Sequence, residues 1–260
     1  MRDVKDHVQH QFGDVAANYR TSKVHAGGKD LDLMVKSAIL TPESVVLDAG
    51  CGAGHASLAF AGHVGRVIAC DFTPAMLDQV EKLTHEYGVL NVKTQLADVD
   101  SLPFPANSFD LVITRYSAHH WLHPERALAE FRRLLKPNGK LLISDIMASE
   151  NYAQDTFLQT IELLRDPSHV RDYRLSEWRA MLSGAGFASE VLLTFDLTLH
   201  FSTWTKRMAT PPQNAEMIKS LFNGAPADIK RGFGLPLKIR NDDFDFTIPG
   251  GVIRGAAAPD

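Results

Sequence analysis

The sequence is poor in cysteine, has no long apolar run and carries no excess of basic charge. Its 260 residues include only Cys51 and Cys70, too few for a disulfide framework and not at metal-ligand spacing. Apolar runs of about 18 residues, which could cross a membrane, are missing. The opening residues, MRDVKDHVQHQFGDV, carry charges where a signal peptide needs an apolar stretch. These absences predict a soluble, cytoplasmic protein without membrane insertion.

The charge balance also bears on the partner. A formal net charge of -4 provides no general basic field for non-specific binding of nucleic acid. A nucleic-acid partner is therefore disfavoured, although a local basic patch is not excluded. With 45% hydrophobic residues the chain can bury a core.

From about residue 44, short apolar runs alternate with longer amphipathic ones. Expected strands cover 45–47, 67–70, 92–96, 109–114 and 140–146, and expected helices cover 55–64, 74–87 and 125–135. Strands that alternate with helices of this kind imply crossover connections and a parallel sheet covered on both faces. Ligands of such sheets bind at the carboxyl ends of the strands.

The alternation loosens after residue 146. Expected helices there cover 151–164, 175–184 and about 214–223, and expected strands cover 190–201 and 244–253. We find no internal repeat, low-complexity tract or clear linker. A single domain with a less regular C-terminal third is the simplest organisation.

A glycine-rich turn follows the first expected strand, in the sequence VVLDAGCGAG. The strand ends at Asp48, and Gly50, Gly52 and Gly54 line the turn into a helix. Glycines allow a tight turn and let a ligand approach the backbone without meeting a Cβ. The helix N-terminus behind the turn offers free N–H groups to a polar or charged ligand.

Acidic residues follow the next two strands. Asp71 ends the second, where a carboxylate can accept both hydroxyls of a ribose. Asp98 and Val99 follow the third, where they suit an exocyclic amine and a purine face. A glycine turn alone is common, and Asp71 alone could simply cap a helix. Their combination, in this order, predicts a nucleoside site.

The glycine spacing separates two nucleoside ligands. A dinucleotide turn normally reads G-x-G-x-x-G and receives a pyrophosphate. Here the glycines alternate, and Asp48 would repel a pyrophosphate but attract an α-ammonium. The turn therefore favours a ligand with a zwitterionic amino-acid tail.

Four stretches, VLDAGCGAGHASLAFA, VIACDFTPAMLDQVEK, ADVDSLPFPANSFDLVITRYSAHHW and FRRLLKPNGKLLISD, resemble the class I S-adenosylmethionine-dependent methyltransferases. The chain is most similar to the ubiquinone/menaquinone biosynthesis group, over about residues 10–200. The resemblance implies an α/β fold with a Rossmann-like, doubly wound sheet of seven strands, mostly parallel with an antiparallel last strand and helices on both faces. It also implies an N-terminal helical cap (1–43), a cofactor-binding core (44–147) and a substrate-side part (148–260).

By the same resemblance the cofactor is S-adenosyl-L-methionine. Its expected contacts are Asp48, Gly50 and Gly52 at the methionine part, Asp71 at the ribose, Asp98 and Val99 at the adenine, Phe72 and Met76 beside the adenosine, Tyr19 as a closing residue, and Arg115.

The stretch RYSAHHW, just past the fourth strand, faces the methyl group in such a fold. Methyl transfer needs mainly alignment of donor and acceptor. A base is needed only if the acceptor must lose a proton. His119 is the preferred candidate base, with His120 and Tyr116 as rivals. Equally, both histidines could simply hydrogen-bond the loop or the cofactor.

Metal binding is not expected at these histidines. His119, His120 and His123 form a cluster in sequence, but adjacent histidines rarely share one ion and no Cys or carboxylate pair completes a set.

The leading hypothesis is thus a methyltransferase acting on a small-molecule acceptor by in-line transfer. One alternative is a non-methylating protein on the same fold, either a cofactor-holding cyclase or a nucleoside sensor. A second, an NAD-dependent oxidoreductase, is disfavoured by the glycine spacing. The sequence does not identify the methyl acceptor. It does not determine the oligomeric state either, and a homodimer is compatible with it.

Two later stretches, LLRDPSHV (163–170) and WTKR (204–207), place cations near aromatic or apolar residues. Such groups suit an acidic or planar substrate. A solvated surface is the commoner role for any one charged residue, so no site is assigned to them.

Overall fold

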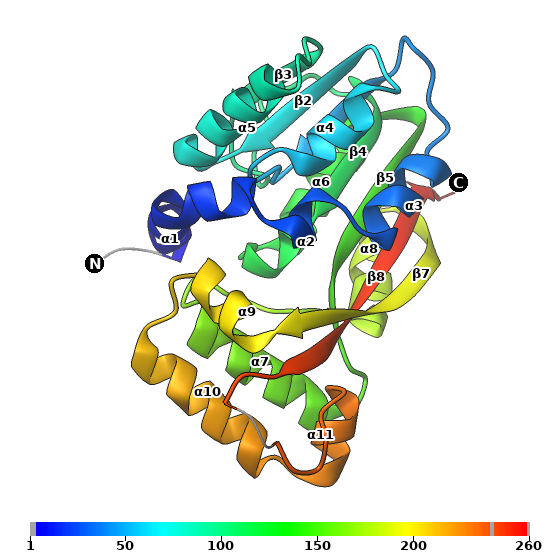
Figure 1. Ribbon diagram of the computed structural model, residues 1–260. Coiled ribbons are helices and arrows are strands. Elements are labelled where there is room, and N and C mark those ends of the chain that lie inside the picture. The colour runs from blue at the N-terminus through cyan, green and yellow to red at the C-terminus, as the bar shows by residue number, and fades with distance from the viewer. Residues whose placement is uncertain (1–3, 240–241, 259–260) are drawn as a thin grey trace.

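The computed structural model describes residues 4–239 and 242–258, in which an eight-stranded sheet is flanked by helices (Figure 1). The strands are β1 (Val45–Ala49), β2 (Arg66–Asp71), β3 (Val92–Leu96), β4 (Phe109–Arg115), β5 (Leu135–Ala148), β6 (Tyr173–Arg174), β7 (Phe187–His200) and β8 (Asp245–Ala257). Their order is β3-β2-β1-β4-β5-β8-β7, with β6 paired to β5. β8 runs antiparallel to both neighbours, and the other pairs are parallel. The expected fold class is confirmed.

Helices cover both faces of this sheet, as the alternation along the strands requires. They are α1 (Val4–Arg20), α2 (Lys23–Ala26), α3 (Lys29–Ser37), α4 (His55–Ala61), α5 (Pro74–Glu86), α6 (Pro124–Leu134), α7 (Tyr152–Arg165), α8 (Leu175–Gly184), α9 (Phe201–Arg207), α10 (Pro212–Gly224) and α11 (Ala227–Gly232). On β1, Leu47 belongs to the core cluster that includes residues of α6 and α8, whereas its neighbour Val46 belongs to the cluster that includes residues of α3 and α4. A membrane-spanning helix would need more length and apolarity than any helix in the described part has.

The predicted core elements agree with the structure to within a few residues at most boundaries. β5 is the main difference, because it begins at Leu135, directly after α6, and includes the Lys136–Gly139 segment between the expected helix and the expected strand. The last strand, expected at 244–253, spans Asp245–Ala257. Both cysteines are free and buried.

Sequence patterns missed several short elements. These are β6, α9, α11 and a 3-10 turn at Ala118–His120. α9 follows β7 without an intervening turn, so periodicity did not separate the two. Each of these elements owes its position to tertiary packing rather than to its own pattern.

The C-terminal helices build a second core beyond the strand ends. Trp204 of α9 and Phe222 of α10 pack there against Phe246 of β8. α1 lies across the opening between the two parts and contacts α5 and α9 (Figure 1). The carboxyl ends of the parallel strands are thereby covered.

Candidate functional site

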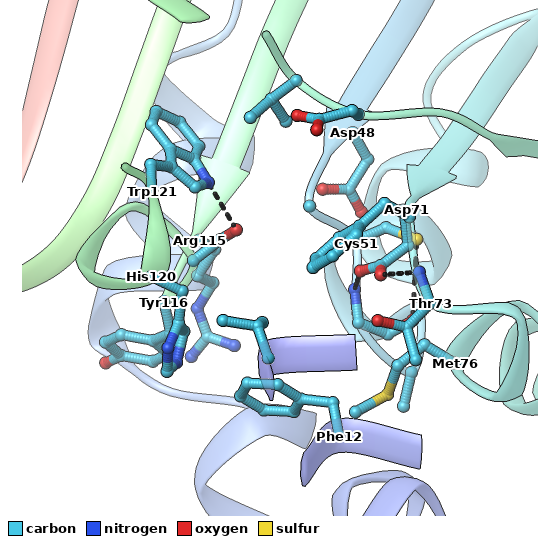
Figure 2. A pocket seen from close by; sticks show the side chains of 18 of the residues that line it. Phe12, Asp48, Cys51, Asp71, Thr73, Met76, Arg115, Tyr116, His120 and Trp121 are labelled. Atoms are coloured by element: carbon cyan, nitrogen blue, oxygen red, sulfur yellow. Dashed lines mark hydrogen bonds between the residues drawn. The ribbon is translucent and has the colours of Figure 1, made fainter. Parts of the chain in front are cut away.

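A cavity lies under α1 at the carboxyl ends of β1, β2 and β4. Its volume is about 1030 Å³, including the part open to solvent. All the residues expected to contact a cofactor line it: Tyr19, Asp48, Gly50, Gly52, Asp71, Phe72, Met76, Asp98, Val99 and Arg115. Figure 2 shows the β4 side, with Tyr116, His120 and Trp121, opposite the β1–β2 side, with Asp71 and Met76. We name this space the first cavity.

The glycine turn follows β1 directly, and its backbone explains the choice of residue. Gly50 and Gly52 have φ values of 70° and 50°, in the left-handed region that favours glycine. A Cβ on Gly50 would also overlap the Ser117 hydroxyl, whereas one on Gly52 would meet nothing within 4 Å. The turn therefore leaves open space above Gly52 for a ligand to approach the backbone.

Asp48 presents a buried carboxylate at the end of β1. Its Oδ2 accepts a hydrogen bond from Ser57 Oγ at 2.6 Å, and the fully buried Oδ1 has no partner in the part of the chain that the structure describes. Burial raises the pKa of Asp48 to about 6, although the Ser57 bond opposes the rise. A buried acceptor without a donor suits an incoming cation.

Asp71 ends β2 and links the turn to the next helix. Its Oδ2 accepts from Gly52 N at 3.0 Å and its Oδ1 from Thr73 N at 2.9 Å (Figure 2). Burial raises the pKa of this carboxyl, although the hydrogen bonds from the Thr73 and Gly52 backbone oppose the rise. Each oxygen retains a lone pair for a ligand hydroxyl. Asp71 thus bonds the start of the helix, as a lone capping residue would, but it also closes the cavity wall.

Comparison with known proteins supports the same assignment. A methyltransferase domain model matches residues 47–143. Over 244 residues the chain is 38% identical to the uncharacterized methyltransferase YcgJ of Bacillus subtilis, covering 94% of this chain and 96% of YcgJ. The chain belongs to the class I S-adenosylmethionine-dependent methyltransferases.

Solved structures and a third relative agree with this methyltransferase family. The YcgJ crystal structure matches with a TM-score of 0.85 and 36% identity, over 89% of this chain and 99% of YcgJ. BH2331 of Bacillus halodurans matches with a TM-score of 0.84 and 30% identity, over 89% and 100%. The ubiquinone/menaquinone biosynthesis C-methyltransferase UbiE of Blochmanniella pennsylvanica is 37% identical over 105 residues, which cover 39% of this chain and 41% of UbiE.

In this methyltransferase, α1 adds cavity residues that sequence reasoning missed. Lys5 Nζ bonds Asp98 Oδ2 at 2.5 Å and Asp100 Oδ2 at 2.6 Å. Asp98 Oδ1 also accepts from Asp100 N at 3.0 Å. The expected adenine residue is therefore already tied to the covering helix, and Val8 and Phe12 of α1 line the cavity beside it.

Arg115 lines the first cavity, but its guanidinium forms hydrogen bonds with the N-terminal segment. Its guanidinium pairs with Asp30, with Nε 2.6 Å from Oδ2, and donates to the carbonyl oxygens of Val24, His25 and Gly27. Both charged side chains are only 4% exposed. Arg115 thereby anchors α2 and α3 over the site, a role that the sequence did not indicate, and its contact with the cofactor stays a prediction.

The stretch RYSAHHW turns sharply as it leaves β4. Tyr116 has a φ of 52°, which is strained for a bulky residue, and its ring lies 4.6 Å from the Arg115 guanidinium carbon. Trp121 packs inward on Phe131 and donates from Nε1 to Ser117 Oγ at 3.1 Å (Figure 2). The 3-10 turn between them carries the two histidines.

The adjacent histidines face different surroundings, although their ring centroids are only 4.3 Å apart. His120 lines the first cavity, donates from Nδ1 to the Ser168 carbonyl at 3.1 Å and packs edge-on against Phe12. His119 lines a second cavity and donates from Nδ1 to Asp145 Oδ1 at 2.7 Å. His120 therefore bonds the loop backbone, whereas His119 has a carboxylate partner.

The three candidate bases differ in acidity. Burial lowers the pKa of His119, but the charge and hydrogen bond of Asp145 outweigh it and raise that pKa to about 9. Burial and the charge of His119 lower the pKa of His120 to about 4. Burial raises the pKa of Tyr116. At neutral pH His119 is thus a cation, His120 is a neutral ring and Tyr116 is a phenol.

The second cavity adjoins the first and lies toward the C-terminal helices. Its volume is about 470 Å³, including the part open to solvent. Tyr19, His25 and Tyr116 line both cavities and so form the wall between them. Tyr19 of this wall belongs to α1 and donates from its hydroxyl to Met208 Sδ at 2.8 Å. His25 belongs to α2 and bonds Ser22 Oγ.

A cluster with metal-ligand spacing does exist, but not the one considered from sequence. His119, Asp145 and Asp172 offer ligand atoms within 4.8 Å of one another. His120 and His123 are outside this group. Asp145 already accepts hydrogen bonds from His119, Ala118 N and Ile146 N. This satisfied carboxylate is better described as the partner of a protonated histidine than as a free ligand.

Proposed function

We propose that this methyltransferase binds S-adenosylmethionine in the first cavity and transfers its methyl group to a small molecule in the second. The observation that carries the proposal is the shared wall of Tyr19, His25 and Tyr116. The two cavities adjoin at these residues, so a donor in the first and an acceptor in the second would lie next to each other. Bringing the two into alignment is the main contribution that a protein makes to an in-line displacement.

The residues of the first cavity fit the cofactor. The unpartnered Oδ1 of Asp48 suits the α-ammonium, with the open backbone at Gly52 beside it. Asp71 suits the ribose hydroxyls, Asp98 with Val99 suits the adenine, and Phe72 and Met76 supply apolar contacts. When bound, S-adenosylmethionine supplies an electrophilic methyl group on a positively charged sulfur.

For acceptors that must lose a proton, we propose His119 as the base. It lines the second cavity, and Asp145 fixes its Nδ1–H, which leaves Nε2 as the site for proton uptake. Because its pKa is about 9, the neutral form is a strong base but is populated mainly in alkaline solution. His120, with a pKa of about 4, is the weaker base.

Calorimetry with S-adenosylmethionine, S-adenosylhomocysteine and NAD tests the cofactor assignment. We expect binding of the first two and none of NAD. Asp71→Ala should weaken S-adenosylhomocysteine binding by tenfold or more, on the order of 1.4 kcal/mol, whereas Asp78→Ala on the exposed face of α5 should leave it unchanged. Binding of NAD without response to either sulfur compound contradicts the proposal.

Transfer itself is tested with labelled methyl groups and a small-molecule extract. Label is expected in a small molecule and not in protein or nucleic acid. Cofactor binding without transfer to any extract component would instead favour a non-methylating role on the same fold.

A further inference from the structure

The second cavity holds three cations, of which two have close carboxylate partners. Arg165 Nη1 pairs with Glu162 Oε2 at 3.0 Å, and its Nε donates to the Trp204 carbonyl at 3.1 Å. His119 pairs with Asp145 at 2.7 Å. Both cations are therefore neutralised within the protein.

Arg207 is the exception. Among the described residues, no carboxylate lies within ion-pair distance of its guanidinium, and its buried Nε has no hydrogen-bond partner. Burial and the charge of Arg165 lower its pKa to about 10, so it still carries a charge at neutral pH. A half-buried guanidinium with an unused donor calls for an anionic acceptor atom.

Asp172 is the other group of this cavity with an unused atom. Its buried Oδ2 makes no hydrogen bond in the described part of the chain. Burial, with the charges of Glu162 and Asp145, raises its pKa well above the usual value, although His119 opposes this. Asp172 therefore offers an unused acceptor atom, and Arg207 is the cation of this cavity without a close carboxylate partner among the described residues.

The backbone that carries Arg207 is held in place by α1. Asn18 Nδ2 donates to the Arg207 carbonyl at 3.3 Å, and Gln11 Nε2 donates to the Met208 carbonyl at 2.9 Å. Tyr19 bonds the Met208 sulfur from the same helix. The backbone of Arg207 is thus tied to the helix that also carries Tyr19 of the wall between the two cavities.

Beside its polar and charged residues, the second cavity is also lined by apolar side chains. They come mainly from β5, β7, β8 and α9: Val24, Ile146, Leu197, Leu199, Trp204 and Ile248. This part of the lining suits a hydrocarbon or aromatic body.

We infer that the methyl acceptor is an acid with an apolar body, bound through its carboxylate to Arg207. The inference rests on the proposed function and names its substrate class. A single carboxylate matches the single unpaired guanidinium. A phosphate dianion would bring a second negative charge toward Glu162 on the same cavity wall, so the carboxylate is the better match.

A binding experiment tests this without any transfer. The protein is saturated with S-adenosylhomocysteine and titrated with sodium benzoate, benzamide and phenyl phosphate. Benzoate should bind at least tenfold more tightly than benzamide and more tightly than phenyl phosphate. Arg207→Met should abolish this preference, Arg207→Lys should retain part of it, and the exposed neighbour variant Lys206→Met should leave it unchanged.

Two results overturn the inference: benzoate and benzamide that do not differ, or a benzoate preference that survives in Arg207→Met. Stronger binding of phenyl phosphate overturns the carboxylate assignment. The affinity for S-adenosylhomocysteine in every variant reports that the protein is folded. If the wild-type protein fails to bind S-adenosylhomocysteine, the proposed function is wrong. If it binds S-adenosylhomocysteine normally but does not prefer benzoate to benzamide, only this inference is wrong.

A second arm uses the natural acceptor. A small-molecule extract is separated by anion exchange at neutral pH, and each fraction is incubated with the protein and labelled S-adenosylmethionine. The labelled acceptor should come from the retained, anionic fraction and should survive phosphatase treatment. An acceptor in the unretained fraction, or one destroyed by phosphatase, contradicts the inference.

Discussion

His119 Nδ1 lies 2.7 Å from Asp145 Oδ1, whereas the next residue, His120, bonds a backbone carbonyl. Asp145 comes from β5 and the histidines from the turn after β4, so the pairing depends on the sheet rather than on local sequence. Asp145 outweighs burial at His119 and raises its pKa, whereas burial and the charge of His119 lower the pKa of His120.

Asp145→Asn should remove the main group that keeps His119 protonated. Because burial still disfavours the cation, we expect the pKa of His119 to fall from about 9 to below its usual value, which proton NMR of the imidazole will follow. Asp196→Asn, an exposed site on β7, is the control. An unchanged His119 pKa in Asp145→Asn would show that another group holds the proton.

The same shift predicts how stability depends on pH. The folded pKa of His119 lies above the unfolded value of about 6.5, so its stabilising effect is complete below that pH and disappears as the pH rises through about 9. A raised pKa of this size corresponds to about 3 kcal/mol. The unfolding free energy of the wild type, relative to His119→Ala, should therefore decline between pH 6.5 and 9; a constant difference across this interval would contradict the prediction.

For catalysis, His119→Ala should lower turnover and spare cofactor affinity. For an acceptor that loses a proton, the loss should be about 10²-fold or more, as for other general bases, and the wild-type rate should increase with pH up to about 9. Steady-state kinetics with the acceptor found in the extract will measure both. His123→Ala, at the exposed start of α6, is the matched control. A loss of affinity for S-adenosylhomocysteine in His119→Ala would instead make the residue a cofactor ligand or a structural one.

Asp48 predicts a pH dependence of cofactor binding. With a pKa of about 6 in the free protein, its carboxylate becomes protonated in mild acid and loses its attraction for an α-ammonium. The affinity for S-adenosylhomocysteine should fall by up to about tenfold for each pH unit below 6. Asp48→Asn should bind more weakly at neutral pH but show a flat profile from pH 5 to 8 in calorimetry. An equally steep profile in the variant would assign the titration to another group.

Arg115 predicts an effect on stability. Arg115→Met would leave Asp30 buried and unpaired and would remove the bonds that hold the segment between α2 and α3. We expect a loss of about 3–5 kcal/mol in the free energy of denaturant unfolding. Arg66→Met, at the exposed start of β2, should cost little, and adding Asp30→Asn to Arg115→Met should recover part of the loss. Similar costs for the two arginine variants would show that the buried pair is not an anchor.

The sequence was most informative where structure is local or periodic. The apolar runs predicted β1 to β4 closely, and the glycine spacing with Asp48 and Asp71 predicted the edge of the sheet that forms the cavity. Short-range rules are sufficient there, because strand direction and turn chemistry determine which side chains reach that edge.

Long-range pairings could not be predicted in the same way. Lys5 meets Asp98, Arg115 meets Asp30 and His119 meets Asp145 across separations of 93, 85 and 26 residues. The second cavity likewise depends on how α7 and α9 dock, and α9 itself has no pattern that separates it from β7. Neither Arg165 nor Arg207 could be distinguished from a solvated cation before that packing was known.

A crystal structure with S-adenosylhomocysteine tests most directly whether the two cavities serve donor and acceptor. We expect the ribose at Asp71, the α-ammonium at Asp48 and the sulfur at the wall formed by Tyr19, His25 and Tyr116, directed toward the second cavity. A sulfur atom directed away from that wall, or a ligand bound outside the first cavity, would contradict this assignment.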